Sequence, residues 1–152
     1  NNRIEERDFL TFLSTNNLPV PPEFKKANKR ILIVDDDHAM AAAMQRVLKR
    51  SGFETQVAHD GFSAGSMLAN FEPVLMILDL SMPGMSGFDV LEFIRQEKSY
   101  KFLKVLVVSA LDDNQLQRAK RVGANECLSK PFENKHFLQA VGQLLNQDAI
   151  QI

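Results

Sequence analysis

The stretch RILIVDDD, Arg30 to Asp37, places three aspartates directly after a run of aliphatic residues. The run Ile31 to Val34 contains no polar residue, which predicts a strand buried on both faces of a sheet. Such strands are typical of parallel sheets covered by helices on both sides. The three aspartates then stand at the carboxyl end of a buried strand, where their charges repel one another unless a cation or another positive group offsets them.

The chain after residue 30 repeats this arrangement, because short aliphatic runs alternate with longer segments of helical periodicity. Residues 53–59 alternate apolar and polar side chains as an edge strand does, whereas residues 73–80 form a continuous apolar run typical of a central strand. The alternation predicts the α/β class with a doubly wound parallel sheet. The expected strands are 30–35, 53–59, 73–80, 102–110 and 124–129, each followed by a helix.

Residues that commonly cap helices mark several of the expected helix ends. Ser86 and Asp89 have the spacing of a capping box, and Asp112 is a favourable first cap for the next helix. Gly52 and Gly123 are expected to end the helices that precede them. The helix after residue 60 carries four large apolar residues at helical spacing, which are Phe62, Met67, Leu68 and Phe71.

Composition excludes several classes of protein. The chain has 152 residues, 18 basic and 19 acidic side chains and a net charge of -1, so we expect neither direct nucleic-acid binding nor attachment to an anionic membrane. No apolar run approaches the roughly 18 residues of a membrane-spanning helix. Cys127 is the single cysteine, which excludes an internal disulfide and fits a reducing, cytoplasmic location.

The first 29 residues differ from the rest in composition. Residues 3–17 could form about two turns of amphipathic helix, which is marginal in isolation. The prolines Pro19, Pro21 and Pro22 then favour an extended linker. We therefore expect an N-terminal extension and linker at 1–29, followed by one domain at 30–148.

Polar residues follow four of the predicted strands, and each has a structural alternative as a helix cap, turn residue or exposed charge. The carboxyl ends of parallel strands meet at one edge of a sheet, where ligands bind. Carboxylates gathered there suit Mg²⁺, which binds one or two protein carboxylates together with water and phosphate. Of the three consecutive aspartates, Asp37 is the expected helix cap. The residues expected at this edge are Asp35, Asp36 and Asp37, then Asp79, Ser109 and Lys130.

Four motifs in this order resemble the receiver domain of response regulators in two-component signalling. They are VDDD at the first strand, MILDLSMPGMSG at the third, VVSA at the fourth, and KPF at Lys130 to Phe132. The resemblance covers about residues 30–147. It implies a flavodoxin-like fold with five parallel strands in the order 2-1-3-4-5 and five helices.

The resemblance also implies roles for individual residues. Asp79 would accept a phosphoryl group from the phosphohistidine of a sensor kinase or phosphotransfer protein, and the Lys130–Pro131 peptide would be cis. Movement of Ser109 and of the loop 110–113 would transmit the signal. The resemblance is compatible with a homodimer, although no residue here distinguishes dimerising from monomeric receivers. The other implied roles are Asp36 as a direct Mg²⁺ ligand, Asp35 as a ligand through water, the Ser81 carbonyl as a further ligand, and Ser109 and Lys130 as contacts of the phosphoryl oxygens.

One position departs from the family pattern. Three residues before the lysine the family usually has Tyr or Phe, which turns inward on activation, whereas this chain has Cys127. The aromatic part of the switch is therefore not expected here. We interpret Cys127 as a small buried apolar residue rather than a redox sensor. The three histidines, His38, His59 and His136, share no ligand spacing and are expected at the surface or in first turns.

Two other functions start from the same residues. A phosphatase similar to the haloacid dehalogenases would use Asp35 and Asp37 as an Asp-x-Asp pair, although Ala39 replaces the expected Thr or Val and Asp79 would have no role. A degenerate receiver would act only as a binding module. Residues 1–24 resemble the end of an excisionase or MerR-type DNA-binding domain, which implies that a longer parent protein binds DNA while this segment does not.

Overall fold

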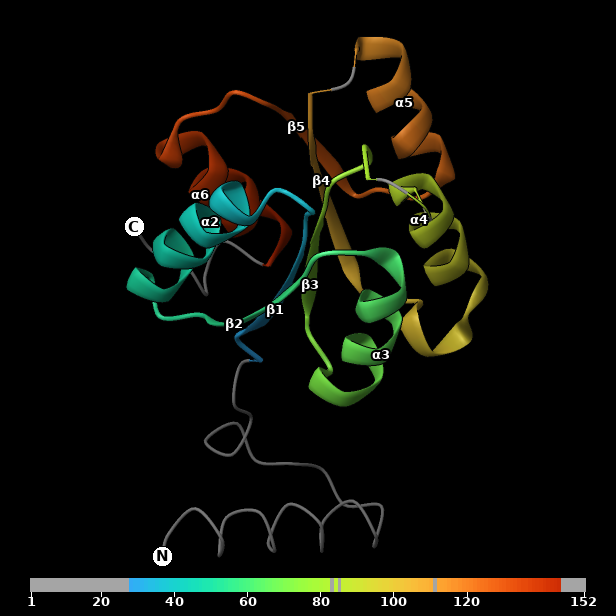
Figure 1. Cartoon of the computed structure of the whole chain (residues 1–152), viewed down its shortest axis with the longest axis horizontal. Coiled ribbons are helices and arrows are strands. Elements are labelled where there is room, and N and C mark those ends of the chain that lie inside the picture. The colour runs from blue at the N-terminus through green and yellow to red at the C-terminus, as the bar shows by residue number, and fades with distance from the viewer. Residues whose placement is uncertain (1–27, 83, 85, 111, 146–152) are drawn as a thin grey trace, which may run out of the picture.

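The structure, a computed structural model, describes residues 28–82, 84, 86–110 and 112–145. The expectations for the N-terminal extension, the proline linker and the DNA-binding resemblance lie outside these residues. Within the described part, strands and helices alternate along the chain as the sequence predicts (Figure 1).

Five parallel strands form one sheet in the order β2-β1-β3-β4-β5, which confirms the predicted flavodoxin-like topology. Val34 pairs with Leu78 across β1 and β3, so the residues that follow them leave the sheet side by side. This register brings the two acidic loops together. The strands are β1 (Arg30–Val34), β2 (Glu54–Ala58), β3 (Leu75–Leu78), β4 (Lys104–Ser109) and β5 (Glu126–Ser129).

Helices cover both faces of the sheet, which explains the uninterrupted apolar runs in the central strands (Figure 1). The face that carries Ile31 and Ile33 packs against α2 (His38–Arg50) and α6 (Asn134–Leu144). The opposite face, which carries Leu32 and Val34, packs against α3 (Gly61–Phe71), α4 (Gly87–Gln96) and α5 (Asp113–Val122). A short 3-10 helix, η2 (Lys98–Tyr100), joins α4 to β4.

The predicted helix caps are confirmed. The Ser86 side chain accepts a hydrogen bond from the Asp89 backbone N–H, and the Ser86 backbone N–H donates in return to the Asp89 carboxylate, which completes a capping box. Asp112 begins α5 in the same way, with Gln115 as its partner. Gly123 ends α5 with a φ of 141°, a value that favours glycine over residues with a Cβ atom.

Two details differ from the expectations. The strands are shorter than predicted; β3, for example, begins at Leu75 instead of residue 73. Phe62 is not part of the buried stripe of α3, since its side chain is 85% exposed. The stripe follows Ala64, Leu68 and Phe71 instead, and Phe62 points away from it.

No helix among the described residues is long and apolar enough to cross a bilayer.

Candidate functional site

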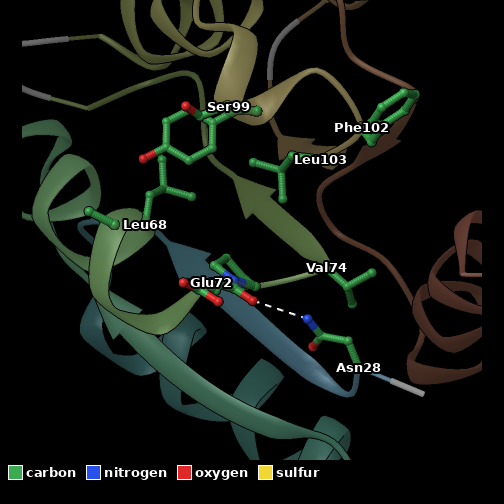
Figure 2. Close-up of a pocket in the computed structure, with 10 residues that line it drawn as sticks. Asn28, Leu68, Glu72, Val74, Ser99, Phe102 and Leu103 are labelled. Carbon is green, nitrogen blue, oxygen red and sulfur yellow. Dashed lines mark hydrogen bonds between the residues drawn. The ribbon is translucent and has the colours of Figure 1, made fainter. Parts of the chain in front are cut away.

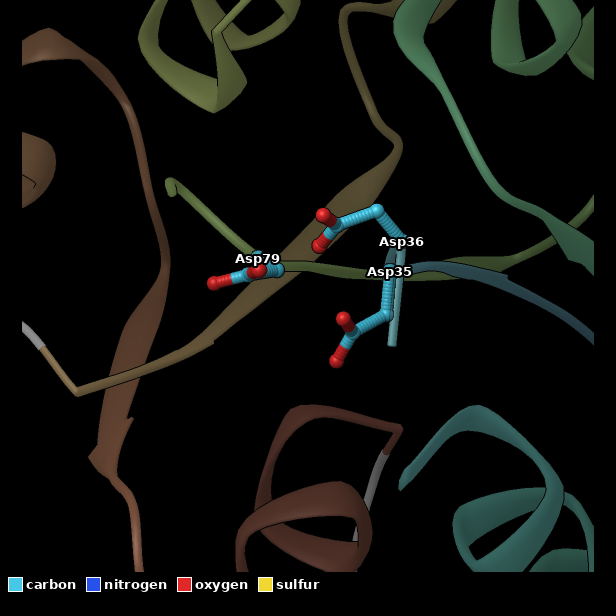
Figure 3. A group of neighbouring side chains, drawn as sticks. All are labelled: Asp35, Asp36 and Asp79. Carbon is cyan, nitrogen blue, oxygen red and sulfur yellow. The ribbon is translucent and has the colours of Figure 1, made fainter. Parts of the chain in front are cut away.

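Three carboxylates meet at the carboxyl edge of the sheet. Asp35 and Asp36 follow β1, and Asp79 follows β3, the neighbouring strand (Figure 3). One oxygen of each carboxylate lies within 4.8 Å of the others. The prediction that these residues gather at one point is therefore confirmed, although they are separated in sequence.

Asp35 is held in place by two partners. Its Oδ1 accepts a hydrogen bond of 2.9 Å from the backbone N–H of Asp37, and its Oδ2 pairs with Lys130 Nζ at 2.9 Å. The side chain of Asp35 is 1% exposed. Because a buried carboxylate needs such compensation, Lys130 and the Asp37 N–H together offset the cost of burying this side chain.

Asp79 is more weakly compensated than Asp35. Its Oδ1 accepts one long hydrogen bond of 3.3 Å from the backbone of Ser81. Burial raises the pKa of Asp79 and the nearby charge of Asp35 raises it further, while Lys130, the Ser81 backbone and the Ser109 hydroxyl oppose that increase. A carboxylate with few partners in a crowded acidic pocket is chemically available to an electrophile.

Ser109 ends β4 and is completely buried. Its hydroxyl forms no hydrogen bond with any described group, although it lies near enough to Asp79 to favour the ionised carboxylate. A buried hydroxyl without a partner is costly in folded proteins, so its presence calls for an explanation. A ligand oxygen bound beside Asp79 would supply the acceptor.

The donor set fits a hard divalent cation. Two carboxylates about 4 Å apart repel by roughly 4 kcal/mol at an effective dielectric near 20. Lys130 supplies one positive charge to the three carboxylates through its pair with Asp35. The atoms that gather here are carboxylate oxygens, the ligand type that Mg²⁺ prefers. Asp35, Asp36 and Asp79 could hold the ion.

Asp37 does not belong to this acidic group. It caps α2, with its carboxylate accepting a hydrogen bond of 3.0 Å from the Met40 backbone, as the sequence predicts. Asp37 is therefore engaged as a helix cap and is not free to act as the second carboxylate of the Asp-x-Asp pair that the phosphatase alternative requires.

Two histidines that sequence reasoning set aside lie next to the site. The rings of His38 and His59 stack with centroids 3.7 Å apart, and His59 Nδ1 donates to the Asp35 carbonyl at 2.9 Å. His38 is exposed in the first turn of α2, as expected. Its stack on His59 was not foreseen, because it requires the β2–α3 loop to fold over the start of α2. His136 is exposed on α6.

Gly87 is a second contributor that the sequence reasoning missed. It begins α4 and donates a hydrogen bond of 3.2 Å to the Leu80 carbonyl. A Cβ atom at this position would overlap the Asp79 carbonyl oxygen and the Leu80 Cα. The absence of a side chain therefore allows α4 to pack directly under the loop that presents Asp79.

A sequence model of the response regulator receiver domain matches residues 31–142. The chain belongs to this family. A receiver domain is a phosphoacceptor rather than a turnover enzyme, so the phosphatase alternative is wrong. Membership also implies a partner histidine kinase, and the acidic group is consistent with the Mg²⁺ site typical of receiver domains.

Curated relatives of the receiver include DNA-binding response regulators. The DNA-binding response regulator MtrA of Mycobacterium tuberculosis is 32% identical over 120 residues, which cover 79% of this chain and 52% of MtrA. The response regulator MprA of Mycobacterium avium is 34% identical over 119 residues, which cover 78% of this chain and 51% of MprA. The chain thus spans about half the length of these relatives.

Solved receiver structures have the same fold. The receiver domain of a response regulator from Bermanella marisrubri is 51% identical, with a TM-score of 0.74, covering 78% of this chain and 99% of that one. The chemotaxis protein CheY4 of Vibrio cholerae is 28% identical, with a TM-score of 0.73 and the same coverage. The receiver domain of a DNA-binding response regulator (merR) from Colwellia psychrerythraea is 28% identical, with a TM-score of 0.72, covering 76% and 97% of the two chains.

Two further sequence expectations can be compared with the receiver structure. The Lys130–Pro131 peptide is cis, as the resemblance implies. Cys127 is half-buried, its Sγ donates to the Leu116 carbonyl at 3.4 Å, and burial raises the pKa of its thiol. The raised pKa suits a packing residue rather than a redox sensor, but the side chain is half-buried and not fully buried as expected.

Proposed function

We propose that this receiver accepts a phosphoryl group on Asp79 from the phosphohistidine of a partner kinase or phosphotransfer protein, in a Mg²⁺-dependent reaction. The proposal is carried by one observation: Asp35, Asp36 and Asp79 converge at the sheet edge, with Lys130 paired to Asp35. Asp79 is buried, its carboxylate accepts a single long hydrogen bond of 3.3 Å from the described residues, and burial raises its pKa. These features support Asp79 as the nucleophile.

In the proposed transfer, an Asp79 oxygen attacks phosphorus in line with the leaving nitrogen. The oxygen–phosphorus bond forms as the phosphorus–nitrogen bond breaks, and the electron pair of the broken bond returns to the imidazole. Lys130 and the Ser109 hydroxyl would contact phosphoryl oxygens, which gives the unpartnered Ser109 Oγ an acceptor. In-line attack of water on phosphorus would later release phosphate and restore the carboxylate.

The metal would be held by Asp35 through water, by Asp36 and Asp79 directly, and by the Ser81 carbonyl. When bound, Mg²⁺ would offset the negative charge that the phosphoryl group brings to an already acidic pocket. The carboxylates must be ionised to serve as ligands, so binding of the ion would also hold Asp79 in its reactive form.

Phosphorylation would act as a switch for an output. The residues that would respond are Ser109 and the loop 110–113, which ends at the first residue of α5. Control of transcription is supported by the relatives named as DNA-binding response regulators. We assign the receiver to residues 30–148, and an extension with a linker to residues 1–29. The protein would act in the cytoplasm, where its kinase phosphorylates it. Residues 1–152 would make no direct contact with nucleic acid.

Phosphoryl labelling tests the proposal. The purified chain is incubated with Mg²⁺ and labelled acetyl phosphate, and the modified residue is mapped by mass spectrometry. Label should appear on Asp79, require Mg²⁺, and disappear in Asp79→Asn. Asp113→Asn, which changes an exposed aspartate on α5, should label normally. Label that persists in Asp79→Asn would contradict the assignment.

The remaining alternative is a degenerate receiver that only binds a partner. The complete set of Asp35, Asp36, Asp79, Ser109 and Lys130 speaks against it. Binding of beryllofluoride, a phosphoryl mimic, distinguishes the two alternatives. A functional receiver should bind it with Mg²⁺ and shift the NMR signals of Ser109 and Ala110, whereas a degenerate one should not respond.

A further inference from the structure

A pocket of about 580 Å³ opens at the edge of the sheet opposite the acidic site. Its lining comes from residues that precede three strands, such as Val74 before β3 and Leu103 before β4, and from the last turn of α3 (Figure 2). Nothing in the proposed phosphotransfer uses this pocket. It therefore requires an explanation of its own.

The pocket has an apolar, partly aromatic wall. Leu68, Val74 and Leu103 line it together with the rings of Tyr100 and Phe102. Phe102 is 84% exposed, which is unusual for a large apolar side chain. An exposed aromatic ring beside an apolar hollow is a typical feature of a surface that binds another segment.

The chain enters the domain at the rim of this same pocket. Asn28 lines the pocket, and its Nδ2 donates to the Glu72 carbonyl at 3.1 Å (Figure 2). Its Oδ1 accepts from the Arg30 backbone at 2.9 Å, and the Arg30 side chain donates to the Phe71 carbonyl at 2.7 Å. These bonds fix the entry point, so the residues before Asn28 must begin their path at the pocket.

The segment that precedes this entry point has the composition to fill it. Residues 19–24 read PVPPEF, which contains two prolines at the Pro-x-x-Pro spacing followed by Phe24. In polyproline II geometry Pro19 and Pro22 lie on one face, and segments of this kind bind grooves lined by aromatic rings at a low entropic cost. Phe24 lies four residues before Asn28, a distance of at most about 14 Å in extended chain.

We propose that the linker 19–24 of the same chain docks in this pocket, with Phe24 and the prolines against Tyr100, Phe102 and Leu103. Because the linker is covalently attached at the rim, its effective concentration is about millimolar, and weak contacts suffice to hold it. Docking would fix the direction in which residues before the linker leave the receiver, on the side opposite Asp79.

Limited trypsin digestion tests the proposal on the full 152-residue chain. Lys25 and Lys26 follow Phe24 directly, so docking should shield the bonds after them. Phe102→Ala should accelerate cleavage there by roughly three- to tenfold, as expected for the loss of one aromatic contact. Phe62→Ala is the matched control, because Phe62 is also exposed, at 85%, but does not line the pocket.

The second variant is Phe24→Ala, which should accelerate cleavage to the same extent and add nothing in a Phe102→Ala background. Residue 24 can also affect the intrinsic rate at which trypsin cleaves after Lys25 and Lys26. Cleavage of synthetic peptides of residues 17–30, with and without Phe24→Ala, measures this effect so that it can be subtracted. Nuclear Overhauser contacts between the Phe24 ring and the Leu103 methyls provide an independent readout in the unmodified chain.

Three outcomes would overturn the proposal. Equal cleavage of the unmodified chain and Phe102→Ala would show that the linker does not occupy the pocket, as would additive effects of the two substitutions. Protection that increases with protein concentration would assign the pocket to a second copy of the chain instead.

Discussion

Lys130 Nζ lies 2.9 Å from Asp35 Oδ2, although the two residues are 95 positions apart in the chain. The pair joins the loop after β5 to the loop after β1, across the carboxyl edge of the sheet. Asp35 is 1% exposed and Lys130 16% exposed, so the interaction is only weakly screened by solvent. Before any phosphoryl group is bound, Lys130 thus compensates the charge of Asp35, a carboxylate of the proposed metal site. In the proposed phosphorylated state the same lysine would contact a phosphoryl oxygen.

Lys130→Met should destabilise the receiver because it leaves Asp35 buried without its ionic partner. We expect the free energy of unfolding in urea, measured with EDTA, to fall by about 2–3 kcal/mol. Saturating Mg²⁺ should restore more stability in the variant than in the unmodified chain, since the ion then neutralises Asp35 alone.

The control for this substitution is Lys120→Met. Lys120 pairs with Glu126 at 2.9 Å, but the two side chains are 51% and 39% exposed. Loss of an exposed pair should change the free energy of unfolding by less than about 1 kcal/mol. If the two variants are equally stable, the pair at the site contributes no more than a surface ion pair.

Asp79→Asn should stabilise the receiver at neutral pH in the absence of Mg²⁺. The pKa of Asp79 is raised from 3.8, mainly by burial, so the folded state binds its proton more tightly than the unfolded state does. The contribution of Asp79 is therefore most favourable at low pH and is lost as pH rises through its folded pKa. Urea unfolding should show an advantage of the variant that is largest near pH 7 and shrinks as pH falls toward about 4.

Glu92→Gln serves as the control for the pH dependence, because Glu92 is exposed on α4. Its stability relative to the unmodified chain should vary little over the same range. A stability advantage of Asp79→Asn that grows on acidification would reverse the sign and contradict the raised pKa.

Gly87→Ala should disturb the loop that presents Asp79. The added Cβ would overlap the Asp79 carbonyl oxygen and lie 2.9 Å from its carbonyl carbon, both of which are backbone atoms that cannot rotate away. We expect a loss of about 1–3 kcal/mol in the free energy of unfolding and slower labelling by acetyl phosphate.

Gly65→Ala provides the opposite case in the same protein. Gly65 lies inside α3, and nothing lies within 4 Å of the position its Cβ would take. This substitution should stabilise the chain by about 0.5–1 kcal/mol through the helix propensity of alanine. Equal effects of the two substitutions would show that close contact at Gly87 is unimportant.

The parallel sheet and the acidic group could be predicted because both depend on local pattern, whereas the strand order came from the resemblance to receiver domains. The buried runs of β1 and β3 identify central strands, and the aspartates that follow them are then necessarily at one edge of a parallel sheet. Helix limits such as Ser86 and Asp112 follow from capping chemistry within four residues, which involves no tertiary contact.

The features that the sequence did not reveal depend on how separate elements pack. The stack of His38 on His59 requires the β2–α3 loop to fold over α2, and the contact at Gly87 requires α4 to approach the β3 loop. Phe62 was misplaced because periodicity gives a helical stripe but does not say which side chain at its margin meets the sheet.

Cys127→Tyr introduces the aromatic residue that is usual at this position in the family. A pocket of about 210 Å³, lined by Leu116, Gln117 and Cys127 among others, opens beside the thiol and can receive the ring. The free energy of unfolding should therefore change by less than about 1.5 kcal/mol, and ring protons should show contacts to the Leu116 methyls. Ala119→Tyr is the control, because Ala119 is fully buried on α5 and should not tolerate a ring. If both substitutions cost more than about 3 kcal/mol, the space beside Cys127 is not available to an aromatic side chain, and the small residue is required by packing.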